Sequence, residues 1–191
     1  MEDDADIVCC NYYAEYNKKQ IKVEYGISEE THDDVMNSYP STIYSAVWNK
    51  IIKRELYINN NIRWFKNINM QDDLGITTRL RILSTKTTVL NRCLYHYNKQ
   101  NISSISIAPK KSNIYEQIEC ARQLDLWIKE FAGENYYMLG NKIKFWAKCG
   151  LAIHPSTRDI DQWRSVFPET NVFVRKFKQM PIYIRLPLFL Y

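Results

Sequence analysis

The chain has 191 residues, of which 46% are hydrophobic and 14% aromatic, and its formal net charge is +5. This composition excludes a wholly disordered chain and allows one sizeable core or two small lobes. Only five glycines are present, which argues against a loop-rich all-β fold and against a glycine-rich phosphate loop. No apolar run reaches the length of a membrane span, so the sequence predicts no transmembrane helix.

The charge is divided unevenly along the chain. Residues 1–34 contain ten acidic residues against three lysines, a net of −7, whereas the remaining residues have a net of +12. A basic body behind an acidic leader is typical of a protein that binds a polyanion. The alternative is an ordinary soluble surface with an excess of basic residues.

Residues 1–40 are polar, acidic and rich in tyrosine, and we expect them to form an N-terminal arm. Ser41 and Thr42 are then expected to cap a helix whose apolar residues recur at helical spacing from Ile43 to Leu56. The stretch from Ile76 to Tyr97 is rich in Thr, Val, Ile and Leu, and Arg79 to Ile82 alternates with a period of two. This pattern predicts a small β-hairpin among the helices.

Beyond a loop at residues 108–113, the chain is predicted to be helical. Apolar residues recur at three- and four-residue steps from Ile114 to Phe131, and Gly133 is expected to end this helix. A second helix is expected over Tyr137–Cys149 with Gly150 as its C-cap, and a third after Ser156–Asp159. We therefore predict a mainly α fold with an acidic arm (1–40), an N-terminal lobe (41–110) and a C-terminal lobe (111–191).

The cysteines and histidines form no pattern typical of a disulfide framework or a metal site. The five cysteines are an odd number without regular spacing, which predicts reduced thiols in a cytosolic compartment. None of the three histidines is spaced as a metal ligand with a cysteine or another histidine, so we predict no metal and no cofactor. Because no nucleophile motif or acid/base pair stands out, we also predict that the chain is not an enzyme.

The segment from Ser165 to Ile184 contains a further pattern. Its anchors are Phe167, Pro168, Thr170, Phe173, Phe177, Lys178, Pro181 and Ile184. Their spacing resembles a segment of orthobunyavirus nucleoproteins that reads Phe-Phe-Pro-Gly-(Ser/Thr)-Glu-Met-Phe and then Phe-(Lys/Arg)-Phe-Tyr-Pro. Three stretches upstream resemble the same family: Ile62–Phe65, Ala121–Glu130 and Lys148–Leu151. The resemblance covers residues 62–186 and is tight only over 148–186.

This resemblance implies a two-lobed helical nucleoprotein that encapsidates single-stranded RNA, without sequence preference, in a basic cleft between the lobes. It also implies homo-oligomers joined through terminal arms, an association with the viral polymerase, and a location in the virion nucleocapsid and the host cytoplasm. No membrane partner is expected.

Cations interleaved with aromatic rings suit an RNA strand, because phosphates pair with charges and bases stack on rings. Arg79 and Arg81 would share one face of a strand, and Tyr183 is the aromatic residue that we expect to contact a base. The predicted RNA-binding residues are Arg63, Arg79, Arg81, Lys110, Lys111, Lys142, Lys144, Lys178, Tyr183 and Arg185.

Two other functions fit parts of the sequence. A helical viral accessory protein could use its apolar tail, Pro187–Tyr191, to bind a host protein. A metal-dependent nuclease could use His32, Asp33 and Asp34, although the further acids and the catalytic lysine of that enzyme class are not found in matching order.

Overall fold

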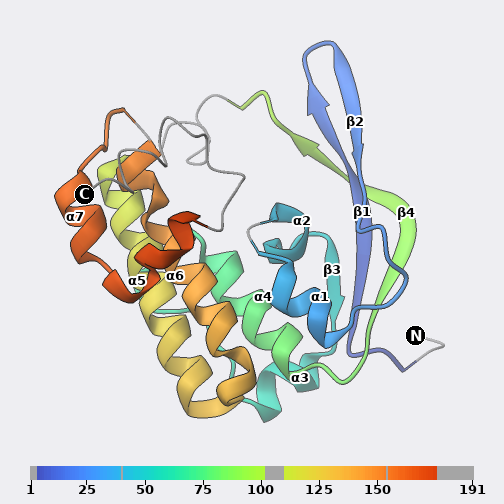
Figure 1. Cartoon of the computed structure of the whole chain (residues 1–191). Helices are drawn as coiled ribbons and strands as arrows, with labels where there is room; N and C mark the ends of the chain where they lie inside the picture. The colour runs from blue at the N-terminus through green and yellow to red at the C-terminus, as the bar shows by residue number, and fades with distance from the viewer. Residues whose placement is uncertain (1–3, 40, 102–109, 154, 176–191) are drawn as a thin grey trace. The chain divides into compact units, whose positions relative to one another are not determined.

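The computed structural model describes residues 4–39, 41–101, 110–153 and 155–175 (Figure 1). The chain divides into two compact units. Unit 1 comprises residues 1–67 and 71–108, and unit 2 comprises residues 68–70 and 109–191.

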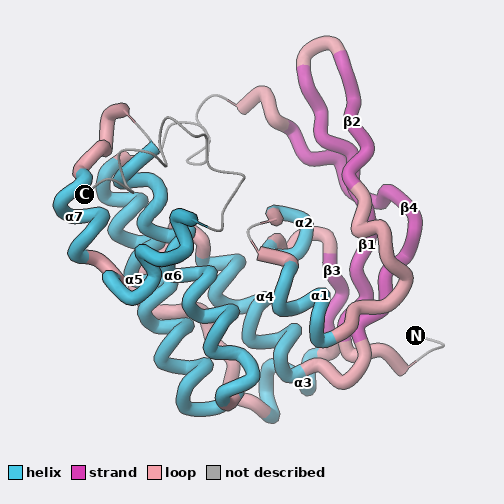
Figure 2. The backbone as a smooth tube through the Cα atoms, viewed as in Figure 1, coloured by secondary structure: helices cyan, strands magenta, loops and turns pink. Residues whose placement is uncertain are grey.

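Unit 1 is built on a four-stranded mixed sheet whose central strand is β1 (Ile7–Tyr16). The strands β2 (Lys19–Val23) and β3 (Lys50–Ile52) pair antiparallel with the C-terminal and N-terminal parts of β1, respectively. The long strand β4 (Thr87–Asn98) pairs parallel with β1 along most of its length (Figure 2). Parallel pairing requires a long crossover, and here the helices of unit 1 lie between the two strands in the chain.

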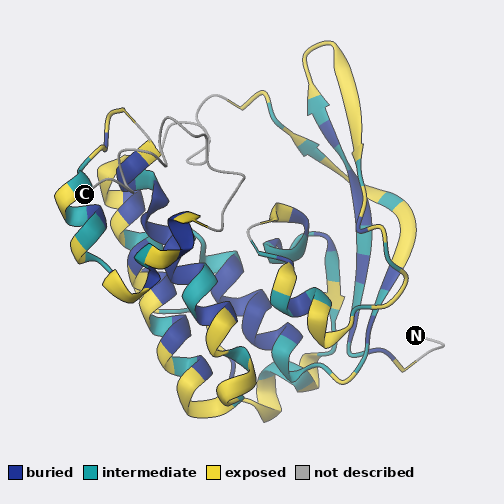
Figure 3. Ribbon diagram, viewed as in Figure 1, coloured by how far each residue is buried: buried dark blue, intermediate teal, exposed yellow. Residues whose placement is uncertain are grey.

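Four helices belong to this crossover: α1 (His32–Asn37), α2 (Thr42–Ser45), α3 (Arg54–Asn59) and α4 (Asp72–Leu83). Only α4 is long, and its residues from Leu74 to Arg81 are all buried (Figure 3). A helix buried on every side must contain apolar residues all round or find partners for its polar ones. The fold of unit 1 therefore depends on how the polar side chains of α4 are satisfied.

Arg81 shows how one buried cation of α4 is stabilised. Its guanidinium forms an ion pair with Glu30, with Nε 2.8 Å from Glu30 Oε2, and both side chains are almost fully buried. Arg81 Nη1 also donates to the Ser38 hydroxyl at 2.9 Å, and the guanidinium lies over the Tyr44 ring, 5.0 Å from its centroid. These contacts join α4 to α1, to α2 and to the segment before α1.

Unit 2 is helical. Its elements are α5 (Lys111–Trp127), the π-helix η1 (Ile128–Ala132), the 3-10 helix η2 (Glu134–Tyr136), α6 (Tyr137–Ile153), α7 (Ile160–Ser165) and the 3-10 helix η3 (Pro168–Arg175). Lys148 of α6 is fully buried. Its ammonium donates to the carbonyl oxygens of Val166 (2.8 Å) and Phe167 (3.1 Å) and to Asn171, and so attaches η3 to α6.

The expected helices of unit 2 are confirmed, with one difference at an end. The helix begun near Ile114 ends at Gly133, which has a φ of 84°, and Asp159 caps α7 through the backbone N–H of Gln162. Gly150 is not a C-cap, because α6 continues to Ile153. No described helix is long and apolar enough to cross a membrane.

The prediction of a mainly α fold is wrong, because unit 1 contains a mixed sheet. The helix expected from Ile43 to Leu56 stops at Ser45 and is followed by β3, whose residues alternate in exposure. The expected hairpin is also wrong, since Arg79–Ile82 lies in α4 and only Thr87–Asn98 is a strand. The division at residues 40 and 110 stays a prediction.

Replacing Arg81 by methionine should lower the free energy of unfolding by about 3–5 kcal/mol, because the variant leaves Glu30 buried without its cation. Urea unfolding followed by circular dichroism measures this loss. The matched control is Arg92→Met, since Arg92 is exposed on β4, and it should change stability by less than about 1 kcal/mol. Equal losses in both variants would contradict the role assigned to the ion pair.

Candidate active site at the start of helix α4

Two adjacent carboxylates open α4. Asp72 and Asp73 are its first residues, and Gln71 before them has left-handed backbone angles (φ 65°, ψ 23°). Asp72 Oδ1 accepts the backbone N–H of Asp73 at 2.9 Å. The first turn of a helix favours negative charge, because its backbone N–H groups have no partners within the helix. The pair therefore lies at a helix end that favours negative charge.

The carboxylate of Asp73 also joins α4 to the segment after α2. Its Oδ2 accepts the backbone N–H of Val47 at 3.3 Å. One turn further along α4, Thr77 Oγ1 lies 2.8 Å from the Ser45 carbonyl oxygen and 2.7 Å from that of Asp73, so its hydroxyl can donate to either. These contacts fix the segment 45–47 against the start of α4.

Burial raises the pKa of Asp73, and the neighbouring charge of Asp72 acts in the same direction, whereas the Val47 N–H and Lys50 oppose it. A carboxylate with a raised pKa is a better proton acceptor than an ordinary one, so the environment of Asp73 suits general-base chemistry. Asp73 accepts its hydrogen bond from Val47 of another segment, whereas Asp72 accepts one from the N–H of Asp73 within its own turn, so Asp72 is less tied to the rest of unit 1 and better placed to meet a ligand.

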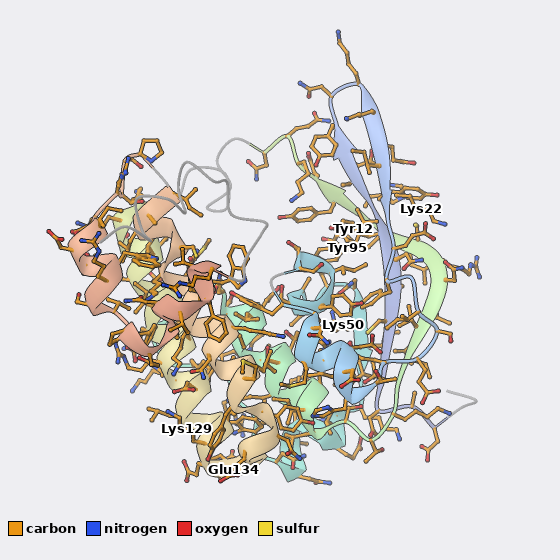
Figure 4. All side chains as sticks on the ribbon, in the orientation of Figure 1. Tyr12, Lys22, Lys50, Tyr95, Lys129 and Glu134 are labelled. Carbon is orange, nitrogen blue, oxygen red and sulfur yellow. The ribbon has the colours of Figure 1, made fainter. Side chains whose placement is uncertain are left out.

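Lys50 of β3, labelled in Figure 4, contacts the same part of the chain. Its ammonium donates to the carbonyl oxygens of Ile43 (3.0 Å) and Ala46 (2.6 Å) and to Asn49 Oδ1 (2.9 Å). Tyr25 donates its hydroxyl to the same Ile43 oxygen at 2.7 Å. Burial lowers the pKa of Lys50 to about 8, so the cation is present at neutral pH and is lost at moderately alkaline pH.

An aromatic cluster lies next to Lys50. Trp48 stacks on Tyr95 and Tyr97, with ring centroids 4.3 and 5.2 Å apart, and meets Tyr12 edge-on at 4.9 Å. Figure 4 shows Tyr12 and Tyr95 side by side on β1 and β4. A cavity of about 190 Å³ adjoins the cluster, and Trp48, Lys50 and Tyr95 are among its lining residues. The segment before β3 is thus held by packing as well as by hydrogen bonds.

Several residues predicted to bind RNA make contacts within the protein. Arg79 is buried and donates from Nε to the Gly75 carbonyl oxygen (2.7 Å) and from Nη2 to that of Arg63 (2.6 Å). Arg81 is buried with Glu30, as described above. Because both arginines lie on a helix, the strand face on which they were expected to meet RNA does not exist.

The predicted lysines lie in different surroundings. Lys144 is buried and pairs with Asp125 (3.2 Å) and Glu169 (2.7 Å), whereas Lys111 is exposed and lies 3.4 Å from Asp159. Lys142 is half-buried, and Lys110 and Arg63 are exposed. Lys178, Tyr183 and Arg185 lie outside the described residues, as does the tail Pro187–Tyr191.

The acids considered for a metal-dependent nuclease have a structural role in part. The side chain of Asp34 accepts the backbone N–H and the hydroxyl of Thr31, which forms a capping box at the start of α1. His32 Nδ1 lies 3.8 Å from Asp33. Within the part of the chain that the structure describes, no three His, Cys, Asp or Glu residues gather as metal ligands. None of the five cysteines forms a disulfide.

No family model and no curated protein matches the sequence. Solved structures of TarS from S. aureus, a GT-A glycosyltransferase, do resemble the fold. TarS 1–349 in complex with UDP-GlcNAc has a TM-score of 0.60 and 12% identity over 90% of this chain and 52% of that chain. The complex of TarS 1–349 with UDP has a TM-score of 0.54 and 14% identity, and the match covers 91% of this chain and 46% of that chain. A further TarS structure has a TM-score of 0.58 and 14% identity, and the match covers 96% of this chain and 30% of that chain.

The chain spans about half the length of TarS 1–349, and the likeness establishes a fold: a four-stranded sheet with helices that resembles the GT-A domain. The resemblance to orthobunyavirus nucleoproteins is therefore wrong. That resemblance implied RNA encapsidation, an RNA partner and nucleocapsid assembly, and these predictions are therefore wrong as well. The expectation that the chain is not an enzyme is also overturned, because the fold that it shares is that of an enzyme.

Asp72 and Asp73 are not among the site residues predicted from the sequence. The signal that could have found them is a pair of adjacent acids directly before a run of apolar and polar residues that is long enough for a buried helix. The prediction of a hairpin over Ile76–Tyr97, with Arg79–Ile82 as a strand, removed the helix whose first turn the acids occupy.

The contribution of Lys50 to the unfolding free energy should rise with pH between pH 8 and about 9.5. Lys50 has a pKa of about 8 in the folded chain against an ordinary 10.5, so the unfolded state binds more protons over this window. Cys9 and Cys149 act in the opposite direction over the same range, because burial raises their pKa in the folded chain whereas thiols of the unfolded chain ionise at about pH 8.5. The Lys50 contribution is therefore measured as a difference between the slopes of the wild type and a Lys50 variant, by urea unfolding across this range.

The slope of the unfolding free energy against pH should be less positive in Lys50→Met than in the wild type, because the variant lacks one of the groups that release a proton on folding. Lys148, whose pKa burial also lowers to about 8, keeps its own contribution in that variant. The control is Lys99→Met, since the ammonium of Lys99 contacts only the Tyr97 ring among the described interactions. Parallel slopes for the wild type and Lys50→Met would show that Lys50 titrates normally.

Proposed function

We propose that the chain is a glycosyltransferase-like domain that acts on a sugar nucleotide, with Asp72 as its general base. The observation that carries this proposal is the likeness to TarS in complex with UDP-GlcNAc, which extends over 90% of the chain. The carboxylate pair at the start of α4 supplies the group that such a reaction needs.

Glycosyl transfer joins an acceptor hydroxyl to the anomeric carbon of the donor sugar. The hydroxyl proton passes to the Asp72 carboxylate as its oxygen attacks the anomeric carbon. The bond from that carbon to the nucleoside diphosphate breaks, and the diphosphate leaves with the electron pair. A base placed in this way contributes about 10²–10⁴-fold to the rate.

Asp73 is assigned a positioning role. Its contact with the Val47 N–H fixes the first turn of α4, and its own N–H fixes Asp72 Oδ1. Asp72 accepts the proton, whereas Asp73 keeps the first turn of α4 in place. Variants at the two positions should therefore differ in their effects on stability.

Release of UDP from UDP-GlcNAc in the presence of saccharide acceptors tests the proposal. Asp72→Asn should lower the rate of release by about 10²-fold or more, because the amide does not accept the proton. Binding of UDP-GlcNAc, measured by calorimetry, and the unfolding midpoint in urea should change little. Asp73→Asn should lower stability as well as rate.

The matched control is Asp33→Asn, because Asp33 is an exposed acid in the first turn of α1, a helix outside the candidate site. It should retain the wild-type rate. The absence of both UDP-GlcNAc binding and UDP release in the wild type would contradict the proposal, as would a full rate in Asp72→Asn.

A further inference from the structure

A second cavity of unit 1 adjoins helix α4. It has a volume of about 220 Å³ and is lined by Tyr57, Ile58, Ile62, Arg63, Trp64 and Ile76. Trp64 is 50% exposed and Ile58 is 53% exposed, and neighbouring exposed apolar side chains are typical of a ligand-binding groove. Arg63 is exposed beside them. The cavity thus combines an accessible indole ring, apolar walls and one cation.

Arg79 of α4 fixes the loop that contains Arg63 and Trp64. The guanidinium of Arg79 donates to the Arg63 carbonyl oxygen at 2.6 Å and lies over the Phe65 ring, 4.0 Å from its centroid. At the other end of the loop, the backbone N–H of Ile62 donates to the Tyr57 carbonyl oxygen at 2.9 Å. The backbone of Arg63 and Trp64 is therefore held in place before any ligand arrives.

Ile76, one of the lining residues, connects the cavity to the helix face of Asp72. Ile76 lines the cavity and follows Asp72 by four residues, so the two share a helix face about 6 Å apart along the axis. This distance is close to the width of one sugar ring. A ring seated in the cavity would therefore place its hydroxyls within reach of the start of α4.

The lining residues indicate the chemistry of the occupant. The face of an indole ring packs against the C–H face of a sugar, and a tryptophan that exposes half of its surface offers that face. A guanidinium presents a planar set of donors that matches a carboxylate or a phosphate. Burial raises the pKa of Tyr57, so its hydroxyl remains a hydrogen-bond donor at neutral pH.

We infer that this cavity, bounded by Trp64 and Arg63, is the acceptor subsite and that it selects a sugar ring bearing a negatively charged group. The inference rests on the proposed function and specifies the class of its acceptor. A carboxylate and a phosphate share the chemistry that Arg63 recognises, so the experiment includes one probe of each kind.

Calorimetric titration of the wild-type chain with glucuronate, glucose 6-phosphate and glucose tests the inference. At least one of the two acidic sugars should bind about tenfold or more tightly than glucose, because it gains a charge-assisted hydrogen bond. Arg63→Gln should remove this preference and leave glucose binding unchanged. Trp64→Ala should weaken the acidic and the neutral sugars alike.

The matched control is Arg92→Gln, which removes one exposed cation from β4 and should leave all three affinities unchanged. Asp72→Asn should still bind the acidic sugar, since the subsite does not require the base. If the wild-type chain binds the acidic sugar but neither binds UDP-GlcNAc nor releases UDP from it, the proposed function alone is overturned. Equal affinity for glucose and the acidic sugars, wild-type affinity in Arg63→Gln, or no binding by any probe would overturn the acceptor subsite.

Discussion

The structure of unit 1 depends on burying α4, a helix whose buried stretch includes two arginines and two threonines. Each buried polar group of such a helix needs a partner, and the partners come from different parts of the chain. Arg81 reaches Glu30 and Ser38, Arg79 reaches the carbonyl of Arg63, and Thr77 reaches that of Ser45. The hydrogen bonds and ion pairs of the buried polar groups of α4 therefore hold the surrounding segments together.

The burial of α4 also positions the residues of the candidate site. Because α4 is held along its length, its first turn is fixed, and Asp72 and Asp73 have a defined place at its start. The Arg79 contact that buries a cation also fixes the loop in which Arg63 and Trp64 stand. The proposed base and the proposed acceptor subsite are thus two consequences of one buried helix, and a change in its packing should reach both.

Local signals were sufficient for unit 2 and insufficient for unit 1. The three- and four-residue spacing from Ile114 to Phe131 predicts α5 because that helix has one buried face, and Asp159 caps α7 as its sequence indicates. In α4 the period disappears because the helix is buried on all sides, so Arg79–Ile82 resembles an alternating strand. The hairpin of β1 and β2 lies within residues 1–40, which we expected to form an arm, whereas the pairing of β1 with β4 joins residues some 80 positions apart and has no local signal. The acid pair was missed for the same reason as the helix that it begins.

The central claim is that a sugar nucleotide meets this chain at the start of α4. Backbone amide shifts in a ¹⁵N NMR titration with UDP-GlcNAc test it most directly. The account predicts that the largest shifts fall on the amides of Val47, Asp72 and Asp73, and that the amides of α7 in unit 2 stay unchanged. Shifts that leave these three amides untouched, or that spread evenly over both units, would contradict it.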